Sequence, residues 1–327
     1  MTHLEEMLGH IKDKHVYIQT HNFPDADAIG SAFGLQHLLK LNNISSTICY
    51  KGKIDRSYMC NLLESLNITL VNIADIPDML PTDEIILVDS QKGNSNILDF
   101  PGDEIICIDH HPVFEDAPYL YRDIRPDMGA CASIIASYFY ESGCEMPQDV
   151  ATAILYGIKM DTANLTRHVA DLDLDMFYNI FHKADLDIIR SLDMSTLQFN
   201  DLSAYAHAIN SIQVYDDISF TNTGIDCPEA LIANISDFML SLSEVSLSIV
   251  YSLRKEGVKL SIRSDTSAYD AGLIINHALK GIGNGGGHSY MAGGFVEFSK
   301  NNFRSTRLFI AQIEERILQA IEDLYKK

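Results

Sequence analysis

Histidines and aspartates gather directly after three short apolar runs of this sequence. His21, Asp25 and Asp27 follow the run HVYIQT, inside the polar stretch HNFPDADAIGS. Asp89 stands near the end of EIILVDS, and Asp109 to His111 close the run EIICIDHH. Imidazole and carboxylate groups bind divalent metals and transfer protons. These residue types therefore indicate either a metal site or acid–base chemistry.

The three runs are predicted to be strands of one parallel sheet. Continuous apolar segments alternate with helical patterns, which is typical of an α/β sheet covered on both faces. In such a sheet, ligands bind outside the carboxyl ends of the strands. We therefore expect the polar residues to meet at one edge. The predicted strands are 15–20, 46–50, 84–88 and 104–108, and the predicted helices are 31–41, 55–66, 127–140 and 148–160, with Asp127 and Gly143 as the expected ends of the third helix.

Each of these residues, taken singly, also has a structural explanation. Asp25 and Asp27 could be turn acids after Pro24, and Asp89 could begin a loop or cap a helix. A lone histidine is more often structural than a ligand. Taken together, acids at the ends of three strands would repel one another unless a cation lay between them. Asp161, at the end of QDVATAILYGIKMD, adds a further carboxylate.

The combination of ligands indicates which cation would bind. Carboxylate and imidazole without thiolate favour Mn, Fe or Zn over Mg or Ca. Several carboxylates around two histidines suit a pair of ions about 3.5–4 Å apart that share a bridging aspartate. Such a pair can generate hydroxide and hold the oxygens of a phosphate. The predicted chemistry is hydrolysis without a covalent intermediate.

The second half of the sequence has a different character and predicts a smaller α/β domain. The predicted division is residues 1–190, a linker at 191–205, and residues 206–327. The loop GNGGGHSYMAGG begins at Gly283, and its glycines let backbone N–H groups approach an anion. A plain glycine-rich turn is the alternative. The predicted strands are 212–220, 245–253, 258–263 and 295–298, and the predicted helices are 228–239, 268–279 and 304–325.

The composition of the chain disfavours some classes of binding partner. The net charge of the 327-residue chain is −21, which disfavours long nucleic acid because phosphate binding needs clustered Lys and Arg. No apolar run approaches the ~20 residues of a membrane helix, and no signal peptide is evident, so we expect a cytoplasmic protein. The six cysteines form no CxxC pair and are expected to be buried, reduced thiols.

The motifs, in this order, resemble those of the DHH phosphoesterase superfamily along essentially the whole chain. HNFPDADAIGS, LVDS, IDHH and GIKMDTANLTR resemble its four motifs, and SIRS with GNGGGHSYMAGG resembles the C-terminal DHH-associated domain. Two departures concern substrate choice. The loop reads PDADA where many relatives have glycine between the acids, and Tyr290 and Met291 follow the glycine loop.

The resemblance implies roles for individual residues. His21 and Asp25 would hold one metal, Asp27 and His110 a second, and Asp89 would bridge them. Asp161 would complete this cluster. The catalytic residues would be His111, facing the scissile phosphate, and Asp109, orienting its neighbours. The substrate-binding residues, facing the metals across a cleft between the domains, would be Arg263, Ser264, Gly285, Gly286, Gly287 and His288.

The resemblance further implies a bacterial oligoribonuclease-like enzyme with two Mn²⁺ per chain, for which Co²⁺ or Fe²⁺ could substitute. The expected substrates are short linear nucleotides such as pGpG, pApA or nano-RNA, including those left from cyclic dinucleotide signalling. Alternatives left open are a phosphatase of 3′-phosphoadenosine 5′-phosphate, a polyphosphate or pyrophosphate hydrolase, and a catalytically silent nucleotide sensor. Amphipathic helices such as 127–140 and 171–181 could form a homodimer interface, although core burial explains such faces as well.

Overall fold

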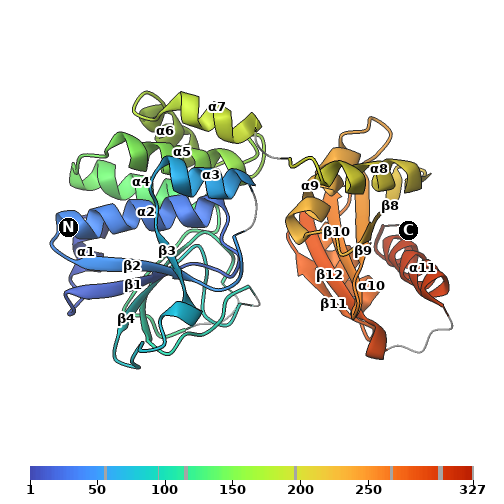
Figure 1. The fold of residues 1–327 in the computed structure, drawn as a ribbon, viewed down its shortest axis with the longest axis horizontal. Helices are drawn as coiled ribbons and strands as arrows, with labels where there is room; N and C mark the ends of the chain where they lie inside the picture. Colours follow the sequence, from blue (N-terminus) through green and yellow to red (C-terminus); the bar gives the residue numbers. More distant parts are fainter. Residues whose placement is uncertain are drawn as a thin grey trace. The chain divides into compact units, whose positions relative to one another are not determined.

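The chain forms two compact units, Met1–Thr196 and Leu197–Lys327, in the computed structural model (Figure 1). The division falls inside the predicted linker, but helices occupy both ends of that range: α7 spans Leu186–Met194 and α8 spans Asp201–Ser211. None of the described helices is long and apolar enough to cross a lipid bilayer. The structure describes residues 1–54, 57–94, 96–113, 117–194, 197–265, 268–300 and 305–325.

The first unit contains the predicted parallel sheet. Its six strands run in the order β3-β2-β1-β4-β5-β6, and every pair is parallel. The two edge strands, β3 and β6, were not predicted. The strand order reverses between β1 and β4, and a crevice opens at the carboxyl ends of strands at such a reversal. The strands are β1 (His15–Gln19), β2 (Ser45–Tyr50), β3 (Leu70–Asn72), β4 (Glu84–Val88), β5 (Asp103–Asp109) and β6 (Tyr121–Ile124).

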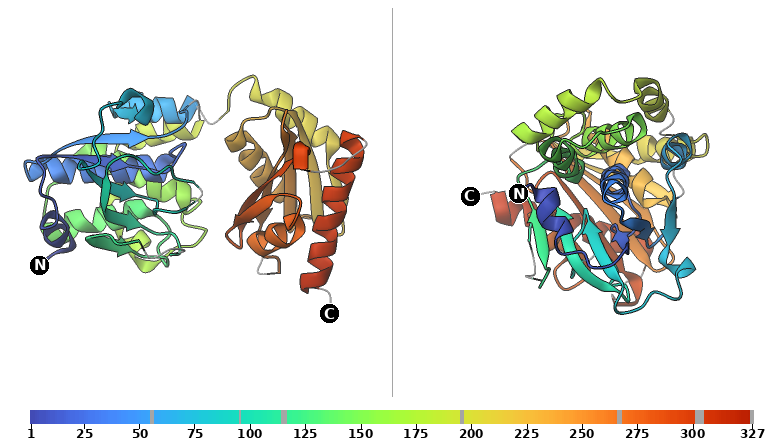
Figure 2. Two further views of the ribbon diagram at one scale, coloured as in Figure 1. Left: turned by 90° about the horizontal axis from the view of Figure 1, so that it is seen from below. Right: turned by 90° about the vertical axis from the view of Figure 1, so that its left-hand side faces the viewer.

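Both faces of this sheet are covered, as predicted, but only one is covered by the main helices. Ile18, Ile86 and Ile108 belong to the core cluster that includes helices α2, α4 and α5. Alternate residues of the strands face the other side, where Met79 and Phe100 pack from non-helical segments. Figures 1 and 2 show the layer of blue and green helices on one side of the strands. The helices are α1 (His3–Leu8), α2 (Ala26–Leu41), α3 (Ser57–Ser65), α4 (Cys131–Ser142), α5 (Gln148–Asp161) and α6 (Asp171–Phe181), with the 3-10 turn η1 (Ile73–Asp75).

In the first unit, helices α2 and α4 begin at other residues than predicted. Helix α2 begins at Ala26, where the Asp25 carboxylate accepts hydrogen bonds from the next turn. Helix α4 begins at Cys131, and the prediction that Asp127 caps it is wrong. Its first N–H groups are bound by the side chain of Asp27, which lies 104 residues earlier in the chain. Gly143, with φ 69°, ends α4 as predicted. The predicted start of α3, Asp55, lies outside the described residues.

Helices α2 and α5 touch backbone to backbone because glycines face the contact. A Cβ atom on Gly30 would lie 2.6 Å from the carbonyl oxygen of Ala153. A Cβ atom on Gly157 would lie 3.1 Å from the Cα of Asp27. This close packing brings the start of α2 beside the end of α5, so that Asp27 and Asp161 meet although they belong to different helices.

The second unit is also α/β, with a mixed sheet. Its order is β11-β12-β10-β9-β8-β7, in which only β8 and β9 pair in parallel among the described strands. Helices α8 and α9 pack on one face, and α10 and α11 on the other. The elements are β7 (Gln213–Tyr215), β8 (Ile218–Ile225), α9 (Glu229–Leu240), β9 (Leu247–Leu253), β10 (Gly257–Ser264), α10 (Ala271–Leu279), β11 (Asn284–Gly287), β12 (Met291–Glu297), η2 (Phe298–Lys300) and α11 (Thr306–Tyr325).

The glycine-rich segment differs from its prediction. Gly285, Gly286 and Gly287 were expected in a loop, but they form part of β11, the edge strand paired with β12. Strand β12 also begins four residues before the predicted strand, at Met291. Alternating hydrophobicity gives no signal in a strand made of glycine, which explains the error. Arg304, the expected start of the last helix, lies outside the described residues.

Replacing Gly30 by alanine should destabilise the first unit. The new methyl group would meet a backbone carbonyl that cannot rotate away, and such overpacking costs about 1–3 kcal/mol. Gly34→Ala is the matched control, because its methyl would meet only side-chain atoms of Ile135 and Ile154. Both substitutions replace glycine by alanine within a helix, so both gain the same stabilisation from helix propensity, about 1 kcal/mol. Urea unfolding of the metal-free proteins should rank Gly30→Ala as the less stable, and the reverse order would contradict this account of the contact.

Candidate metal centre

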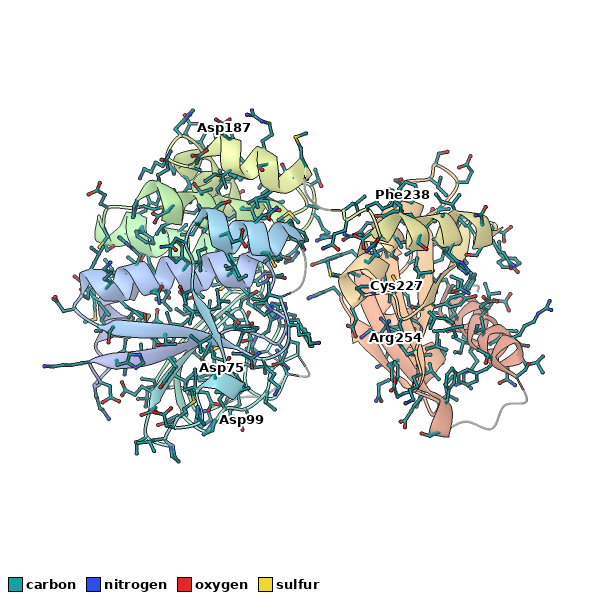
Figure 3. All side chains as sticks on the ribbon, in the orientation of Figure 1. Asp75, Asp99, Asp187, Cys227, Phe238 and Arg254 are labelled. Carbon is teal, nitrogen blue, oxygen red and sulfur yellow. The ribbon has the colours of Figure 1, made fainter. Side chains whose placement is uncertain are left out.

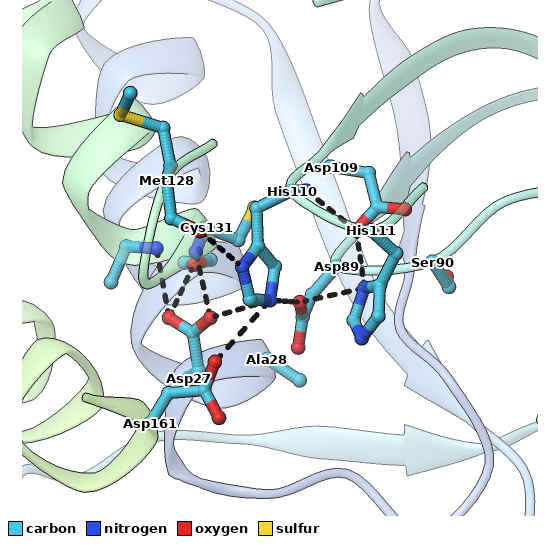
Figure 4. A network of polar contacts seen from close by, with 12 residues as sticks. Asp27, Ala28, Asp89, Ser90, Asp109, His110, His111, Met128, Cys131 and Asp161 are labelled. Carbon is cyan, nitrogen blue, oxygen red and sulfur yellow. Dashed lines mark hydrogen bonds and ion pairs between the residues drawn. The ribbon is translucent and has the colours of Figure 1, made fainter. Parts of the chain in front are cut away.

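The structure gathers the six predicted metal ligands into one cluster at the carboxyl edge of the first sheet. Figure 4 shows four of them, which are Asp27, Asp89, His110 and Asp161. The stretch after β1 supplies three of them, the end of β4 supplies Asp89, the end of β5 supplies His110, and the last turn of α5 supplies Asp161. Three groups of ligand atoms each lie within 4.8 Å of one another. The groups are Asp89, His110 and His111; His21, Asp25 and Asp89; and Asp27, His110 and Asp161.

Asp89 lies between the other ligands. Its Oδ2 is 3.6 Å from His21 Nε2, and its Oδ1 is 3.4 Å from His110 Nε2. The residue is buried, yet Oδ1 accepts no hydrogen bond within the described part of the chain. A buried carboxylate oxygen without a donor is costly, and a cation would remove that cost. This oxygen is the observation that best fits a bound metal.

The two histidines of the cluster are oriented by backbone carbonyls. His21 Nδ1 lies 2.9 Å from the carbonyl oxygen of Asn22, and His110 Nδ1 lies 3.1 Å from that of Met128. A carbonyl oxygen only accepts, so we assign the hydrogen to Nδ1 in both rings. Nε2 of each ring then faces the carboxylates and can offer its lone pair to a metal, which is the usual arrangement of metal-binding histidines.

The carboxylates of the cluster carry more negative charge than its protonated imidazoles can neutralise. Burial lowers the pKa of His21, but Asp25 and Asp89 outweigh it and raise that pKa to about 10. Burial, together with Asp89, raises the pKa of the Asp27 carboxyl. Burial also raises the pKa of Asp161 to about 6. Protons are therefore held where negative charge is in excess, and divalent cations can take their place.

Asp27 has a second role besides its place in the cluster. Its Oδ2 accepts a hydrogen bond from Cys131 N at 2.7 Å, and its Oδ1 accepts one from Ala132 N at 2.8 Å. These are unpaired N–H groups of the first turn of α4, where the helix dipole also favours a negative charge. The carboxylate therefore joins the cluster to the helix layer.

Asp109 is fully buried and holds His111, the predicted catalytic histidine. Asp109 Oδ1 accepts from His111 Nδ1 at 2.9 Å and from the backbone N of His110 at 2.8 Å. Gln91, which the sequence analysis missed, donates to Asp109 Oδ2 at 2.7 Å and to the carbonyl of His111 at 2.9 Å. Nδ1 of His111 is thus held by Asp109. Gln91 stands two residues after Asp89, but glutamine in a loop gives no signal of its own.

A second buried acid was also missed. Asp173, on α6, accepts from the backbone N–H groups of Gly129 and Ala170, each at 2.8 Å, and from the hydroxyl of Ser133 at 2.5 Å. It therefore fixes the segment before α4, whose Met128 carbonyl orients His110. Gly129 and Ser133 lie 44 and 40 residues from Asp173 in sequence, so no local pattern could have identified these contacts.

The second unit contains the predicted substrate-binding residues. A hollow of about 300 Å³ is lined by Arg263, Gly286, Gly287 and His288, and also by Lys259, which the sequence analysis missed. Ser264 and Gly285 do not line it. Ser264 is buried, and its backbone N–H donates to Tyr290. Within the hollow, Arg263 Nε donates to Asp237 Oδ1 at 2.9 Å, and Lys259 pairs with Glu229 at 2.9 Å.

Asp89→Asn should lower the amount of bound manganese without unfolding the protein. The amide keeps the shape of the side chain but removes the charge shared by two ligand groups, so occupancy should fall from about two ions per chain to roughly one or fewer. The metal-free variant should be at least as stable as the parent, because a repelling charge is lost. Elemental analysis measures the occupancy. Asp187→Asn, on exposed α7 (Figure 3), is the control; undiminished metal in Asp89→Asn would contradict the central role of Asp89.

Metal binding should strengthen as the pH rises. His21 is protonated at neutral pH in the metal-free protein because its pKa is raised to about 10. The metal must displace this proton, so log K should increase by about one for each pH unit and each displaced proton. Calorimetric titration with Mn²⁺ between about pH 6.5 and 8.5 measures the binding constant. Repeating it in two buffers of different ionisation enthalpy measures the number of protons released. Binding that is independent of pH and releases no proton would rule out His21 as a ligand.

The comparisons with known proteins agree with this geometry. Residues 15–158 match the DHH family, N-terminal domain. An uncharacterized protein of Methanocaldococcus jannaschii is 29% identical over 84% of this chain, and the cyclic-di-AMP phosphodiesterase PdeA of Listeria monocytogenes is 25% identical over 95%. The chain spans only 56% and 48% of these two relatives. A probable manganese-dependent inorganic pyrophosphatase of Streptococcus thermophilus is 25% identical over 81% of this chain and 93% of its own length.

A solved structure shares the fold of both units. The crystal structure of an exopolyphosphatase-related protein from Bacteroides fragilis aligns with a TM-score of 0.78, at 19% identity, over 99% of this chain and 98% of its own. At this identity the likeness concerns the fold alone. The matched stretch 15–158 contains every residue of the cluster except Asp161. The chain therefore carries a DHH family N-terminal domain over residues 15–158.

Proposed function

We propose that this chain is a manganese-dependent phosphodiesterase that hydrolyses short linear nucleotides to mononucleotides. The observation that carries the proposal is the buried Asp89 shared by two of the three ligand groups, with an oxygen that accepts no hydrogen bond from the described residues. Relatives named as a phosphodiesterase and as manganese-dependent pyrophosphatases support both phosphoester chemistry and manganese.

The chain's own residues divide into two metal-holding groups and a proton donor. His21 and Asp25 would hold one ion, and Asp27, His110 and Asp161 the other, with Asp89 between them. When bound, two such ions acidify water and stabilise the charge that develops on phosphate oxygens.

His111 would protonate the leaving oxygen. Burial lowers its pKa, but the hydrogen bond to Asp109 and the charge of Asp89 raise it overall. The protonated ring is therefore favoured, as a general acid requires. Because Nδ1 donates to Asp109, the proton available for transfer is the one on Nε2. Asp109 fixes the ring and stabilises its charge.

The charges around the cluster favour a small nucleotide over a long or fully inorganic polyanion. A chain with net charge −21 repels extended nucleic acid. In the first unit, Lys159 pairs with Asp193, Lys92 pairs with Glu104, and Arg167 donates to the carbonyl of Asp161. An inorganic polyphosphate would need several cations, whereas a nucleotide also offers a base and a sugar. In the second unit, described by itself, Lys259 and Arg263 line a hollow and pair with Glu229 and Asp237, so a phosphate bound there would have to compete with these acids.

Inorganic pyrophosphate is the second candidate substrate. The observation that favours it is the similarity to a probable pyrophosphatase along 93% of that protein. The same metal-holding residues would serve either reaction, so the cluster alone does not decide between them. A bisphosphorylated nucleoside is compatible with the same site.

Hydrolysis of a substrate panel tests the proposal. Purified protein with manganese would be given pGpG, pApA, 3′-phosphoadenosine 5′-phosphate, a five-nucleotide RNA, polyphosphate and pyrophosphate, with products separated by chromatography. We expect mononucleotides from the two dinucleotides at rates well above phosphate release from the inorganic substrates. Asp89→Asn, purified in parallel, identifies any contaminating hydrolase. If phosphate is released from pyrophosphate alone, the protein is a pyrophosphatase, which is the second candidate. If no dinucleotide is hydrolysed, the proposal is refuted.

A further inference from the structure

An exposed aromatic residue lies inside the metal-binding stretch. Phe23 stands between His21 and Asp25 and is 65% exposed, while its neighbour Pro24 is buried. Two residues of chain span at most about 7 Å, so the Cα of Phe23 lies within that distance of the Cα of each ligand. A large apolar side chain therefore lies at the rim of the metal cluster without contributing to the core.

The backbone of Phe23 is held in an unfavourable conformation. Its φ is 57°, in the left-handed region that bulky residues rarely adopt. The N–H of Phe23 donates to the carbonyl of Lys51 at 2.8 Å, and the N–H of Asn22 donates to that of Asn96 at 2.7 Å. Strain of this kind persists only where surrounding contacts fix it, and it is concentrated at functional sites.

The ring is supported by the loop after β2. A Cβ atom on Gly52 would lie only 2.7 to 2.9 Å from three ring atoms of Phe23, so the ring rests on a position that has no side chain. Gly52 has φ 107°, a conformation that other residues rarely adopt. The ring is thus supported by this loop while most of its surface stays accessible.

Two lysines flank the supporting glycine. Lys51 and Lys53 are both exposed. In a chain with 45 acidic and 24 basic residues, two lysines beside an exposed ring form a local exception to the overall charge. An aromatic face beside positive charge is the combination that binds a base and its phosphate.

We propose that Phe23 is the stacking platform for a nucleobase of the substrate whose phosphate is bound at the metal cluster. This inference rests on the proposed function and adds the group that recognises the base. Stacking on an aromatic side chain changes affinity by roughly 5- to 100-fold per base. Phe23 thereby selects nucleotides over inorganic phosphates, and it does so for any base because every base has a flat face.

The sequence contains no tryptophan, so a single one can report on this position. Phe23→Trp would be titrated with AMP, GMP and ribose 5-phosphate at saturating manganese, which keeps quenching by the ion constant. We expect both nucleotides to quench the fluorescence and the sugar phosphate to leave it unchanged. Tyr178→Trp, on α6 and 71% exposed, is the control and should respond to none of them. Equal responses of the two variants, or of Phe23→Trp to all three ligands, would overturn the proposal.

Affinity provides the second measurement. The ratio of Kd for ribose 5-phosphate to Kd for AMP should fall roughly 5- to 100-fold in Phe23→Ala and be retained in Phe23→Trp. Phe23→Leu keeps an apolar group against Gly52 without a ring, and its ratio should fall like that of the alanine variant. Manganese content is measured in each variant. A ratio that does not change in Phe23→Leu, with metal bound, would reject the stacking role.

These outcomes are separable from those of the substrate panel. Base-dependent quenching without hydrolysis of any dinucleotide would leave a nucleotide-binding site and refute the phosphodiesterase. Hydrolysis of dinucleotides with no base-dependent quenching would leave the enzyme and refute the role of Phe23.

Discussion

Electrostatic repulsion among buried carboxylates is the constraint on which the rest of the first unit depends. Asp27, Asp89 and Asp109 are all buried within one small region, and Asp161 lies against them. Without compensating positive charge, such a group would oppose folding. The surrounding structure supplies part of this charge through raised histidine pKa values and part through backbone N–H groups. Divalent cations would supply the remainder, and once bound they could coordinate the oxygens of a phosphate.

The cluster is held by elements that must approach one another closely. Glycines between α2 and α5 place two ligands from different helices side by side. Asp27 binds the first turn of α4, and Asp173 fixes the segment before that helix. Changes at Gly30 or Asp173 would therefore act on the cluster although neither residue belongs to it.

Local sequence patterns were sufficient to predict the parallel sheet and to predict that the candidate ligands meet at its edge. Each of the residues His21, Asp89 and His110 follows an apolar strand directly, and parallel strands end at one edge, so their meeting could be deduced. The start of α4 could not be deduced, because its capping group is Asp27, more than a hundred residues away in sequence. Gln91 and Asp173 were missed for the same reason: their importance comes from tertiary hydrogen bonds. The roles of the predicted catalytic and substrate-binding residues stay predictions.

The spacing of the ligands along the chain has a consequence for how the protein is made. The cluster draws on residues from His21 to Asp161, and the last ligand is the final residue of α5. During synthesis, the earlier ligands leave the ribosome long before Asp161 does. The complete set exists only when nearly all of the first unit has been translated and α5 has docked on α2. A metal held by the complete set would therefore bind late in biogenesis, after α5 has docked on α2.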